Sequence, residues 1–354
     1  MDDDRLKELR ERIDRLDDEV LGLLNRRAQL AQEIGRLKDG NAYRPEREAR
    51  ILQRLAAASG GPLSGDTVAR LFGEIMSACR ALEQPLAVAY LGPQGTYSEE
   101  AALRRFGAAA RAVPCASIDE VFREVEAGVV GYGLVPVENS TEGAIGRTLD
   151  LLLATPLKVC GEVQLPIHHA LLSRAPDLAS VKKVYSHPQS LGQCHEWLGQ
   201  NLTHAERVPA ASNAEAARLA AGEAGAAAIA SRKAGALFGL PALADNIEDD
   251  PRNTTRFLVV GDLEVAPSGR DKTSLVMSAK NRPGAVHDLL GPFARCGVSM
   301  TRLESRPSRT GLWEYVFFVD IEGHQRDEKV ARALAEMRER AAFLKVLGSY
   351  PAAA

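Results

Sequence analysis

Two basic side chains on one predicted helix are the first residues of this 354-residue chain whose types and spacing suggest chemistry. Arg27 and Lys38 are eleven residues apart, so on a helix they point to within about 20° of each other and lie about 17 Å apart along the axis. Unpaired cations on a core-facing side are costly, which implies buried acids or an anionic ligand. The alternative is a dimerisation coiled coil in which Arg27, the one polar seam residue, fixes the register.

Three further side chains bear on this choice. Arg10 lies about 26 Å along the helix from Arg27 and points about 100° away, so only a partner chain could bring it to the same small ligand. On a later predicted helix, Cys79 and Glu83 are four residues apart and face the same way. Two interpretations of this segment therefore remain, an anion pocket built from two chains and a dimerisation coiled coil.

Polar loops follow several short apolar runs, at the place where open α/β sheets bind ligands. The loop at residues 92–98 leads into a predicted helix at 99–106, so Thr96 and Ser98 can cap an amide-rich helix end that suits a carboxylate. Taken singly, each loop is explained equally well by ordinary turn chemistry. Their convergence on one sheet edge favours a site. The other loop candidates are Asn139, Ser140, Thr141, Ser186, His187 and Gln189.

A threonine-rich string at residues 253–257 stands just ahead of the last predicted strand of this segment. Arg256 is able to bind a carboxylate as a bidentate fork or to serve as a structural ion-pair residue. Thr255 offers a hydroxyl for hydrogen bonding, and Thr254 and Phe257 complete this candidate group.

Apolar spacing predicts the elements that must position these residues. Steps of three and four residues predict one long helix at about 6–37, a second from Pro45 to a break at 59–62, and a third at about 66–84. From residue 86, short apolar runs alternate with helical stretches, which is typical of an α/β domain. The predicted strands are residues 87–91, 132–137, 182–185, 226–230 and 257–260.

The segment after a linker at 267–269 has a third pattern. Its predicted order is a strand at 273–279, a helix at 286–295, strands at 299–305 and 312–321, a helix at 327–342 and a strand at 344–350. The order βαββαβ predicts a ferredoxin-like α+β unit. We therefore expect a multidomain chain, with an all-α domain at 1–84, an α/β domain at 86–263 and an α+β domain at 271–351.

Composition narrows the function classes. A net charge of −3 gives no broad electrostatic surface for nucleic acid, so we expect small-molecule partners. The five cysteines are scattered and lack metal-ligand spacing, so we expect no metal. The acidic N-terminus is unlike a secretory signal and no apolar stretch is long enough to span a membrane, which predicts a cytosolic protein with no membrane partner. No Gly-x-Gly-x-x-Gly follows a strand, which disfavours a nicotinamide dehydrogenase.

The helical segment resembles the all-helical chorismate mutases of the intertwined-dimer type. The resemblance is carried by the strings at residues 9–13, 16–17 and 44–48 together with Arg27 and Lys38. It implies that Arg10 crosses from one subunit to bind a substrate carboxylate and that Arg27 holds a carboxylate in the other subunit. It further implies that Lys38 meets the ether oxygen, that Glu48 meets the ring hydroxyl, and that Arg47 braces the pocket.

The chemistry of chorismate mutases fits these residue types. A Claisen rearrangement needs a clamped diaxial conformer and charge stabilisation at the breaking C–O bond, so cations suffice. The sequence departs from the family pattern where Gln would be the second donor to the ether oxygen, because it has Glu83, and where Ser would lie, because it has Cys79. Glu83 must be protonated to donate, so we predict that mutase activity rises on acidification.

The α/β segment resembles prephenate dehydratases over residues 86–261. The resemblance rests on the Thr-Arg-Phe string at 255–257 and on the strings at 92–98, 138–141 and 186–189, which occur in the family's order. The resemblance implies two α/β lobes like a periplasmic binding protein, with the second lobe at about 165–241 and the active site in the cleft. Prephenate loses carbon dioxide and hydroxide together. Thr255 is the implied catalytic residue and hydrogen-bonds the leaving group, with His187 as second choice for proton donor.

The C-terminal segment resembles the ACT domains attached to prephenate dehydratases, through the strings at 282–286 and 301–307. It implies a phenylalanine site between two such domains in a dimer, so that binding slows the dehydratase. Taken alone, Gly284 permits a tight turn and Glu304 pairs with Arg306 on the surface. The implied phenylalanine-binding residues are Gly284, Ala285, Val286, Glu304, Ser305, Arg306 and Pro307.

These inferences predict one bifunctional enzyme of phenylalanine biosynthesis. It converts chorismate to prephenate and prephenate to phenylpyruvate, needs no cofactor, is inhibited by phenylalanine, and forms a homodimer or higher homo-oligomer. The alternative is a non-catalytic amino-acid-sensing module with a helical dimerisation segment. Arg27 and Lys38 together with the string at 255–257 favour the enzyme, because a passive sensor needs neither.

Overall fold

A computed structural model describes residues 2–37, 42–279, 282–307 and 315–353. The chain divides into two compact units, one formed by Met1–Leu86 with Phe106–Arg111 and the other by Ala87–Arg105 with Ala112–Ala354. The predicted α/β and C-terminal segments therefore lie in one unit and pack on each other.

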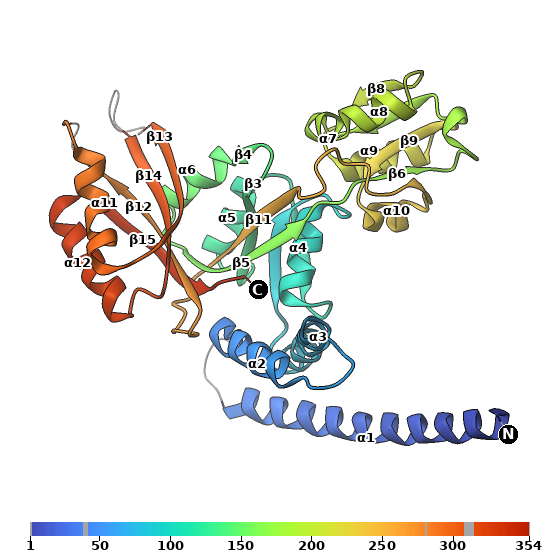
Figure 1. The fold of residues 1–354 in the computed structure, drawn as a ribbon, viewed down its shortest axis with the longest axis horizontal. Coiled ribbons are helices and arrows are strands. Elements are labelled where there is room, and N and C mark those ends of the chain that lie inside the picture. The colour runs from blue at the N-terminus through green and yellow to red at the C-terminus, as the bar shows by residue number, and fades with distance from the viewer. Residues whose placement is uncertain (1, 38–41, 280–281, 308–314, 354) are drawn as a thin grey trace. The chain divides into compact units, whose positions relative to one another are not determined.

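The first unit is helical, as its spacing predicts. Pro45 occupies the first turn of its helix, where a missing N–H costs nothing, and the Ser64 side chain caps the next helix by accepting from Thr67 N. Both α1 and α2 pack on α3. The helices are α1 (Asp2–Leu37), α2 (Pro45–Ala58) and α3 (Gly65–Glu83) (Figure 1).

The α/β segment holds two sheets. The first has the strand order β2-β1-β3-β11-β5, with β4 paired to β3. Its elements are β1 (Ala87–Leu91), α4 (Tyr97–Phe106), β2 (Arg111–Cys115), α5 (Ile118–Glu126), β3 (Tyr132–Asn139), β4 (Gly143–Ala144), α6 (Gly146–Ala154), β5 (Lys158–Pro166) and β11 (Thr254–Gly261). We call this sheet and its helices the first lobe.

The second lobe is built on a sheet of order β10-β6-β9-β7-β8. Strand β9 consists of alanines and one isoleucine, all buried, and these small side chains let α9 pack closely against it. Its elements are β6 (Ala170–Ser173), η1 (Leu178–Ser180), β7 (Lys183–Ser186), α7 (Pro188–Gln193), α8 (His195–Asn201), β8 (Glu206–Pro209), α9 (Asn213–Ala221), β9 (Ala226–Ala230), α10 (Arg232–Phe238) and β10 (Ala242–Ala244).

The C-terminal segment has the predicted order of elements around an antiparallel sheet, β13-β14-β12-β15. Alternate side chains separate its two faces: Leu275 and Met277 pack under α11 and α12, whereas Val276 packs against the first lobe (Figure 1). The elements are β12 (Asp271–Ser278), α11 (Ala285–Cys296), β13 (Met300–Pro307), β14 (Tyr315–Glu322), α12 (Glu328–Arg340) and β15 (Phe343–Pro351).

Two corrections concern strands. The string at 253–257 does not precede the last strand of the α/β segment, because β11 begins at Thr254 and pairs along both sides with β3 and β5. Strand β5 was not predicted from its sequence. Gly161 and Glu162 interrupt its apolar run, and Glu162 is buried only because Arg256 and Lys272 pair with it.

Candidate active sites

A cross-strand pair, Thr255 on β11 and Asn139 on β3, forms the centre of the first candidate site. The two residues are register partners, and Asn139 Nδ2 lies 2.9 Å from Thr255 Oγ1. Asn139 Oδ1 accepts from the backbone N–H groups of Thr141 (3.1 Å) and Glu142 (3.2 Å). A backbone N–H can only donate, so the orientation of the Asn139 amide is fixed. Thr255 Oγ1 therefore accepts from Asn139, and its own proton is directed to another acceptor.

A glutamine that the sequence did not single out joins the second lobe to this pair. Gln193, at the end of α7, donates from Nε2 to Thr141 Oγ1 at 2.8 Å. Its Oε1 lies 3.0 Å from His169 Nε2, and His169 Nδ1 lies 2.9 Å from the Tyr97 hydroxyl. The only sequence signal for Gln193 was its place at the end of the short helix after a strand-end loop.

This chain of hydrogen bonds fixes the histidine tautomer. Because Gln193 Nε2 donates to Thr141, Gln193 Oε1 must face a donor, so His169 carries its proton on Nε2. Burial lowers the pKa of His169, which keeps the ring neutral. Glu248, also missed, accepts from His169 N at 2.8 Å and lies 2.7 Å from His168 Nδ1.

A cavity of about 200 Å³ opens beside these residues. All four of its ionisable lining residues are acidic, so it would repel a doubly charged anion unless cations accompany the ligand. Its lining residues are Thr141, Glu142, Gly192, Gln193, Glu248, Asp249, Asp250 and Asn253.

The predicted carboxylate site at the start of α4 is filled by the chain itself. Thr96 caps the helix, since Glu99 N lies 3.4 Å from its Oγ1, but Ser98 lies inside the helix and is buried. The Glu99 carboxylate accepts from Gly95 N at 2.8 Å and pairs with Lys233 at 3.0 Å. The prediction that Ser98 caps the helix was therefore wrong, and Glu99 occupies the place expected for a ligand.

The string at 186–189 has local structural roles. Ser186 is buried and its hydroxyl lies 3.0 Å from both Asn213 Oδ1 and Ile229 O. His187 caps α7 by accepting from Gln189 N at 3.3 Å, and burial lowers its pKa. The described contacts do not bring these side chains to Thr255.

Arg256 points away from the Thr255 pair, because neighbouring residues of a strand face opposite sides of the sheet. Its Nε lies 2.8 Å from Glu162, its Nη1 2.5 Å from Asp320 and its Nη2 3.0 Å from Tyr350 Oη. Each guanidinium nitrogen thus binds the protein itself. These contacts favour the structural ion-pair interpretation of Arg256 over the carboxylate fork.

Thr254 and Phe257, the remaining candidates of the string at 253–257, have different surroundings. Thr254 and Ser140 form two hydrogen bonds: Ser140 N donates to Thr254 O at 2.9 Å, and the Ser140 side-chain Oγ accepts from Thr254 N at 3.0 Å. Phe257 is 2% exposed and lies in the core.

The helical unit contains a second, partly built site. Glu48 forms an ion pair with Arg80, a residue that sequence reasoning missed. Arg80 is buried, donates to Phe106 O at 2.6 Å and lies 5.3 Å from the Tyr43 ring centre. Glu48 is thus oriented by an arginine on α3 before any ligand binds.

The other predicted residues of this unit are spread along its helices. Cys79 is buried, and Glu83 Oε2 is buried without a hydrogen-bond partner among the described residues. Arg10 and Arg47 are exposed and Arg27 is partly exposed. Lys38 lies outside the described residues. Within the described part of one chain, the predicted cations do not converge.

Comparisons with known proteins match the helical, α/β and C-terminal segments separately. Family models match chorismate mutase type II at residues 9–84, prephenate dehydratase at 88–264 and the ACT domain at 273–339. A bifunctional chorismate mutase/prephenate dehydratase of Neisseria gonorrhoeae is 54% identical over 97% of this chain and 96% of that protein. Its counterpart in Pseudomonas aeruginosa is 51% identical over 99% of both chains.

The chain belongs to the bifunctional chorismate mutase/prephenate dehydratase family. It is therefore an enzyme, and the passive sensor considered above is excluded. A prephenate dehydratase from Arthrobacter aurescens, solved in complex with L-Phe, is 35% identical, has a TM-score of 0.70, and is covered over 90% of its length by 75% of this chain. That of Staphylococcus aureus is 28% identical with a TM-score of 0.67 and is covered completely by 75% of this chain.

In the ACT domain, the predicted ligand-binding residues lie at the start of α11 and along β13. Gly284 precedes α11 with φ 76°, which only glycine adopts without strain, and Val286 is 39% exposed. Arg306 pairs with Asp150 of α6 at 3.3 Å, so the proposed surface pair with Glu304 is not what the structure shows. Ala285, Ser305 and Pro307 lie on these same two elements.

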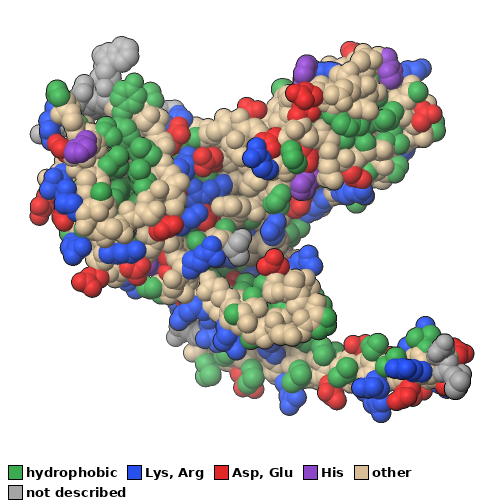
Figure 2. Space-filling model, in the orientation of Figure 1, with side chains coloured by type: hydrophobic (Ala, Val, Ile, Leu, Met, Phe, Trp, Pro, Cys, Tyr) green, Lys and Arg blue, Asp and Glu red, His purple; other side chains and the backbone are tan. Residues whose placement is uncertain are grey.

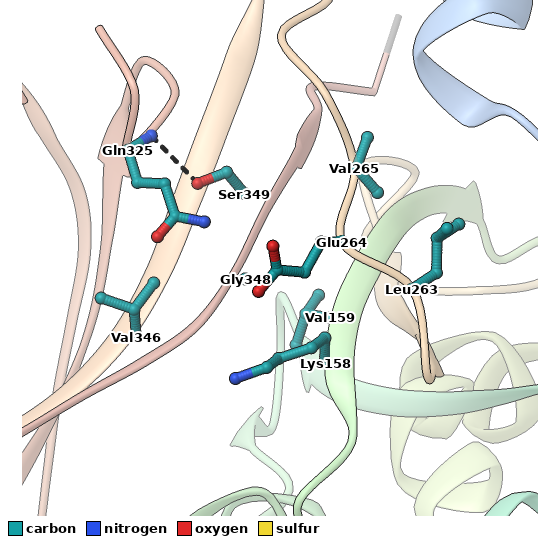
Figure 3. Close-up of a pocket in the computed structure, with 9 residues that line it drawn as sticks. All are labelled: Lys158, Val159, Leu263, Glu264, Val265, Gln325, Val346, Gly348 and Ser349. Atoms are coloured by element: carbon teal, nitrogen blue, oxygen red, sulfur yellow. Dashed lines mark hydrogen bonds between the residues drawn. The ribbon is translucent and has the colours of Figure 1, made fainter.

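A small hollow lies where the dehydratase and ACT domains meet (Figure 3). Its volume is about 70 Å³, compared with about 200 Å³ for the cavity beside Gln193. Gln325 N donates to Ser349 Oγ at 3.0 Å on its wall. The described residues hold no group of three metal-binding side chains. In that same part of the chain, every helix is too short or too polar to cross a membrane.

Proposed function

We propose that Thr255 supplies the hydrogen bond that lets hydroxide leave prephenate, with Asn139 orienting its hydroxyl. As the C–O bond breaks, the carboxylate at the same ring is lost as carbon dioxide, and its electron pair completes the aromatic ring of phenylpyruvate. The leaving oxygen needs a donor. The observation that supports Thr255 is its accepted bond from Asn139, which directs its proton outward.

The mutase reaction is proposed to need two copies of the chain. One face of α1 carries large apolar side chains that remain exposed, among them Ile13 (56%) and Leu16 (58%) (Figure 2). Burying each such side chain is favourable by about 1.5–3 kcal/mol, so a second α1 is a fitting partner. The apolar side chains concerned are Leu6, Leu9, Ile13, Leu16, Val20, Leu23, Leu30 and Ile34.

In such a dimer Arg10 of one chain would enter the pocket of the other. There Arg27 would hold a carboxylate and Lys38 and Glu83 would act at the ether oxygen. Glu48, oriented by Arg80, would accept from the ring hydroxyl. Cys79 and Arg47 would line the pocket. Only cations and donors are needed for the rearrangement, and the chain offers these.

The ACT domain is proposed to bind phenylalanine between two copies and to inhibit the dehydratase. The support is the family membership together with Gly284 and Val286 at an open helix start. From its strand order, we further propose that this domain has a ferredoxin-like fold, and that the two lobes have a fold like a periplasmic binding protein. We place the domains at residues 1–84, 86–263 and 271–351. We propose that the protein is cytosolic.

One experiment tests the proposed function. The purified chain is incubated with chorismate alone, and prephenate and phenylpyruvate are followed by chromatography. We expect prephenate to form first and phenylpyruvate to follow without added cofactor. Chorismate consumption without phenylpyruvate would show that the assigned dehydratase site is wrong.

A further inference from the structure

The two strands that carry Asn139 and Thr255 are held from behind by the ACT sheet. Asn139 and Thr255 are register partners on β3 and β11, and so are their neighbours Glu138 and Arg256. Directly opposed residues face the same side of a sheet and adjacent residues face opposite sides. The first pair thus faces the site, and the second faces the ACT domain.

Two residues of the ACT sheet meet this second pair. Arg302 on β13 and Asp320 on β14 are themselves register partners. Asp320 Oδ2 lies 2.5 Å from Arg256 Nη1, and Arg302 Nε lies 2.9 Å from Glu138 Oε2. We call Glu138, Arg256, Arg302 and Asp320 the junction.

Three of the four junction side chains are largely buried, whereas Glu138 is 37% exposed. The side chains of Arg256, Asp320 and Arg302 are 11%, 6% and 9% exposed. Glu162, fully buried, bridges Arg256 and Lys272, at 2.8 Å from each. Breaking one partner of such a buried set leaves an uncompensated charge, so these side chains hold one arrangement. The Arg302 contact is not aligned as a hydrogen bond, which makes it the weaker of the two links.

Another strand of the ACT sheet, β15, contacts α6, which follows Asn139 in the chain. Lys345 of β15 donates to Leu152 O, Leu153 O and Thr155 O at 3.0, 2.9 and 2.6 Å, where a cation also complements the helix C-terminus. Gly348 crosses β5 so closely that a Cβ there would overlap Val159 O. The ACT sheet is thus also attached to α6 and to β5, and β5 pairs with the site strand β11.

We propose that the junction positions Asn139 and Thr255, so that Arg302 and Asp320 are positioning residues of the dehydratase and transmit the state of the ACT sheet to it. The transmission part rests on the proposed inhibition by phenylalanine. The positioning part does not, because it concerns the enzyme without effector.

The test compares full-length Asp320→Asn and Arg302→Gln with the wild type. We expect Asp320→Asn to lower the dehydratase kcat about tenfold at nearly unchanged KM, and Arg302→Gln to lower it about threefold, since small displacements of reacting groups cost rate steeply. Asp320→Glu, which keeps the charge, should recover part of the loss. The matched control is Arg295→Gln, which removes an ion pair with Glu336 inside the ACT domain only.

Phenylalanine binding, measured by calorimetry, is expected to stay within about twofold of wild type in both variants, because the junction lies outside the proposed ligand residues. At saturating phenylalanine, both variants should retain a larger fraction of their dehydratase activity than the wild type retains. Wild-type kcat together with wild-type inhibition in both variants would overturn the proposal. If the wild-type chain does not bind phenylalanine, the proposed regulation fails, but kcat without effector still decides the positioning. If Asp320→Asn melts early, Glu138→Gln replaces it.

Discussion

The dehydratase and mutase segments differ in how complete their sites are within one chain. In the dehydratase segment Thr255 bonds Asn139, Asn139 bonds Thr141, and Thr141 bonds Gln193. In the mutase segment Arg10 and Arg27 are open to solvent, and α1 leaves its apolar face uncovered. The difference fits our proposal that the dehydratase site is organised within one chain and the mutase site by assembly of two.

The same contrast has a chemical basis. Expulsion of hydroxide needs one proton-donating group that points in a defined direction. A hydrogen-bond network within one chain can hold such a group. A Claisen rearrangement needs only a clamp of charges around a folded conformer, and such a clamp can be shared between two chains. Variants that separate folding from assembly should therefore separate the two activities.

Thr255→Ala should give the largest separation. Loss of the donor to the leaving hydroxyl should lower the dehydratase kcat by about 10²–10⁴, which is the usual range for a general acid. Chorismate consumption by the same preparation should not change. Thr255→Ser keeps the hydroxyl and serves as the matched control. Equal loss of both activities in Thr255→Ala would place the dehydratase chemistry elsewhere.

Ile13→Glu tests whether mutase activity depends on assembly through α1. A charge on the apolar face of α1 should favour monomers, seen by light scattering, and should lower mutase activity about a hundredfold, because several kcal/mol of burial are lost. Dehydratase turnover without effector should remain. Glu19→Gln, also exposed on α1, is the control. A monomeric variant with full mutase activity would disprove the shared site.

The sequence predicted the elements of both regions well and their contacts poorly. The helices at Pro45 and Ser64 and the strands β1 and β9 follow from caps and apolar runs, which are local signals. The roles of Arg256 and Glu162 were not predictable with confidence, because a buried ion pair depends on which strands meet. Thr255 was predicted as a candidate from its string, and its role stays a prediction; Gln193, which bonds Thr141, comes from the other lobe and has no local signal.

Glu83→Gln sharpens the account of the mutase site. Glu83 Oε2 is buried without a hydrogen-bond partner in the described residues, so it is available to a ligand, and it donates only when protonated. Wild-type mutase activity should therefore rise as the pH is lowered from neutral. The variant should show a flat profile. Identical profiles for both proteins would remove this role.

The smallest expected effect concerns His169, which links Gln193 to Tyr97. Burial lowers its pKa below the ordinary 6.5, so between those two values the unfolded chain binds more protons than the folded one. Its contribution to stability is complete above about pH 6.5 and is lost as pH falls through the folded-state pKa. We expect the melting temperature of the dehydratase segment and its kcat to fall together below pH 6.5.

His169→Gln should weaken this acid sensitivity by about twofold, because its side chain cannot take up a proton. His204→Gln, at an exposed position of the second lobe, should leave the profile unchanged. Mutase activity measured in the same samples separates this effect from the acid activation expected of Glu83. If His169→Gln loses activity on acidification as steeply as the wild type, the neutral histidine does not hold Gln193 in place, and the hydrogen-bond chain does not organise the dehydratase site.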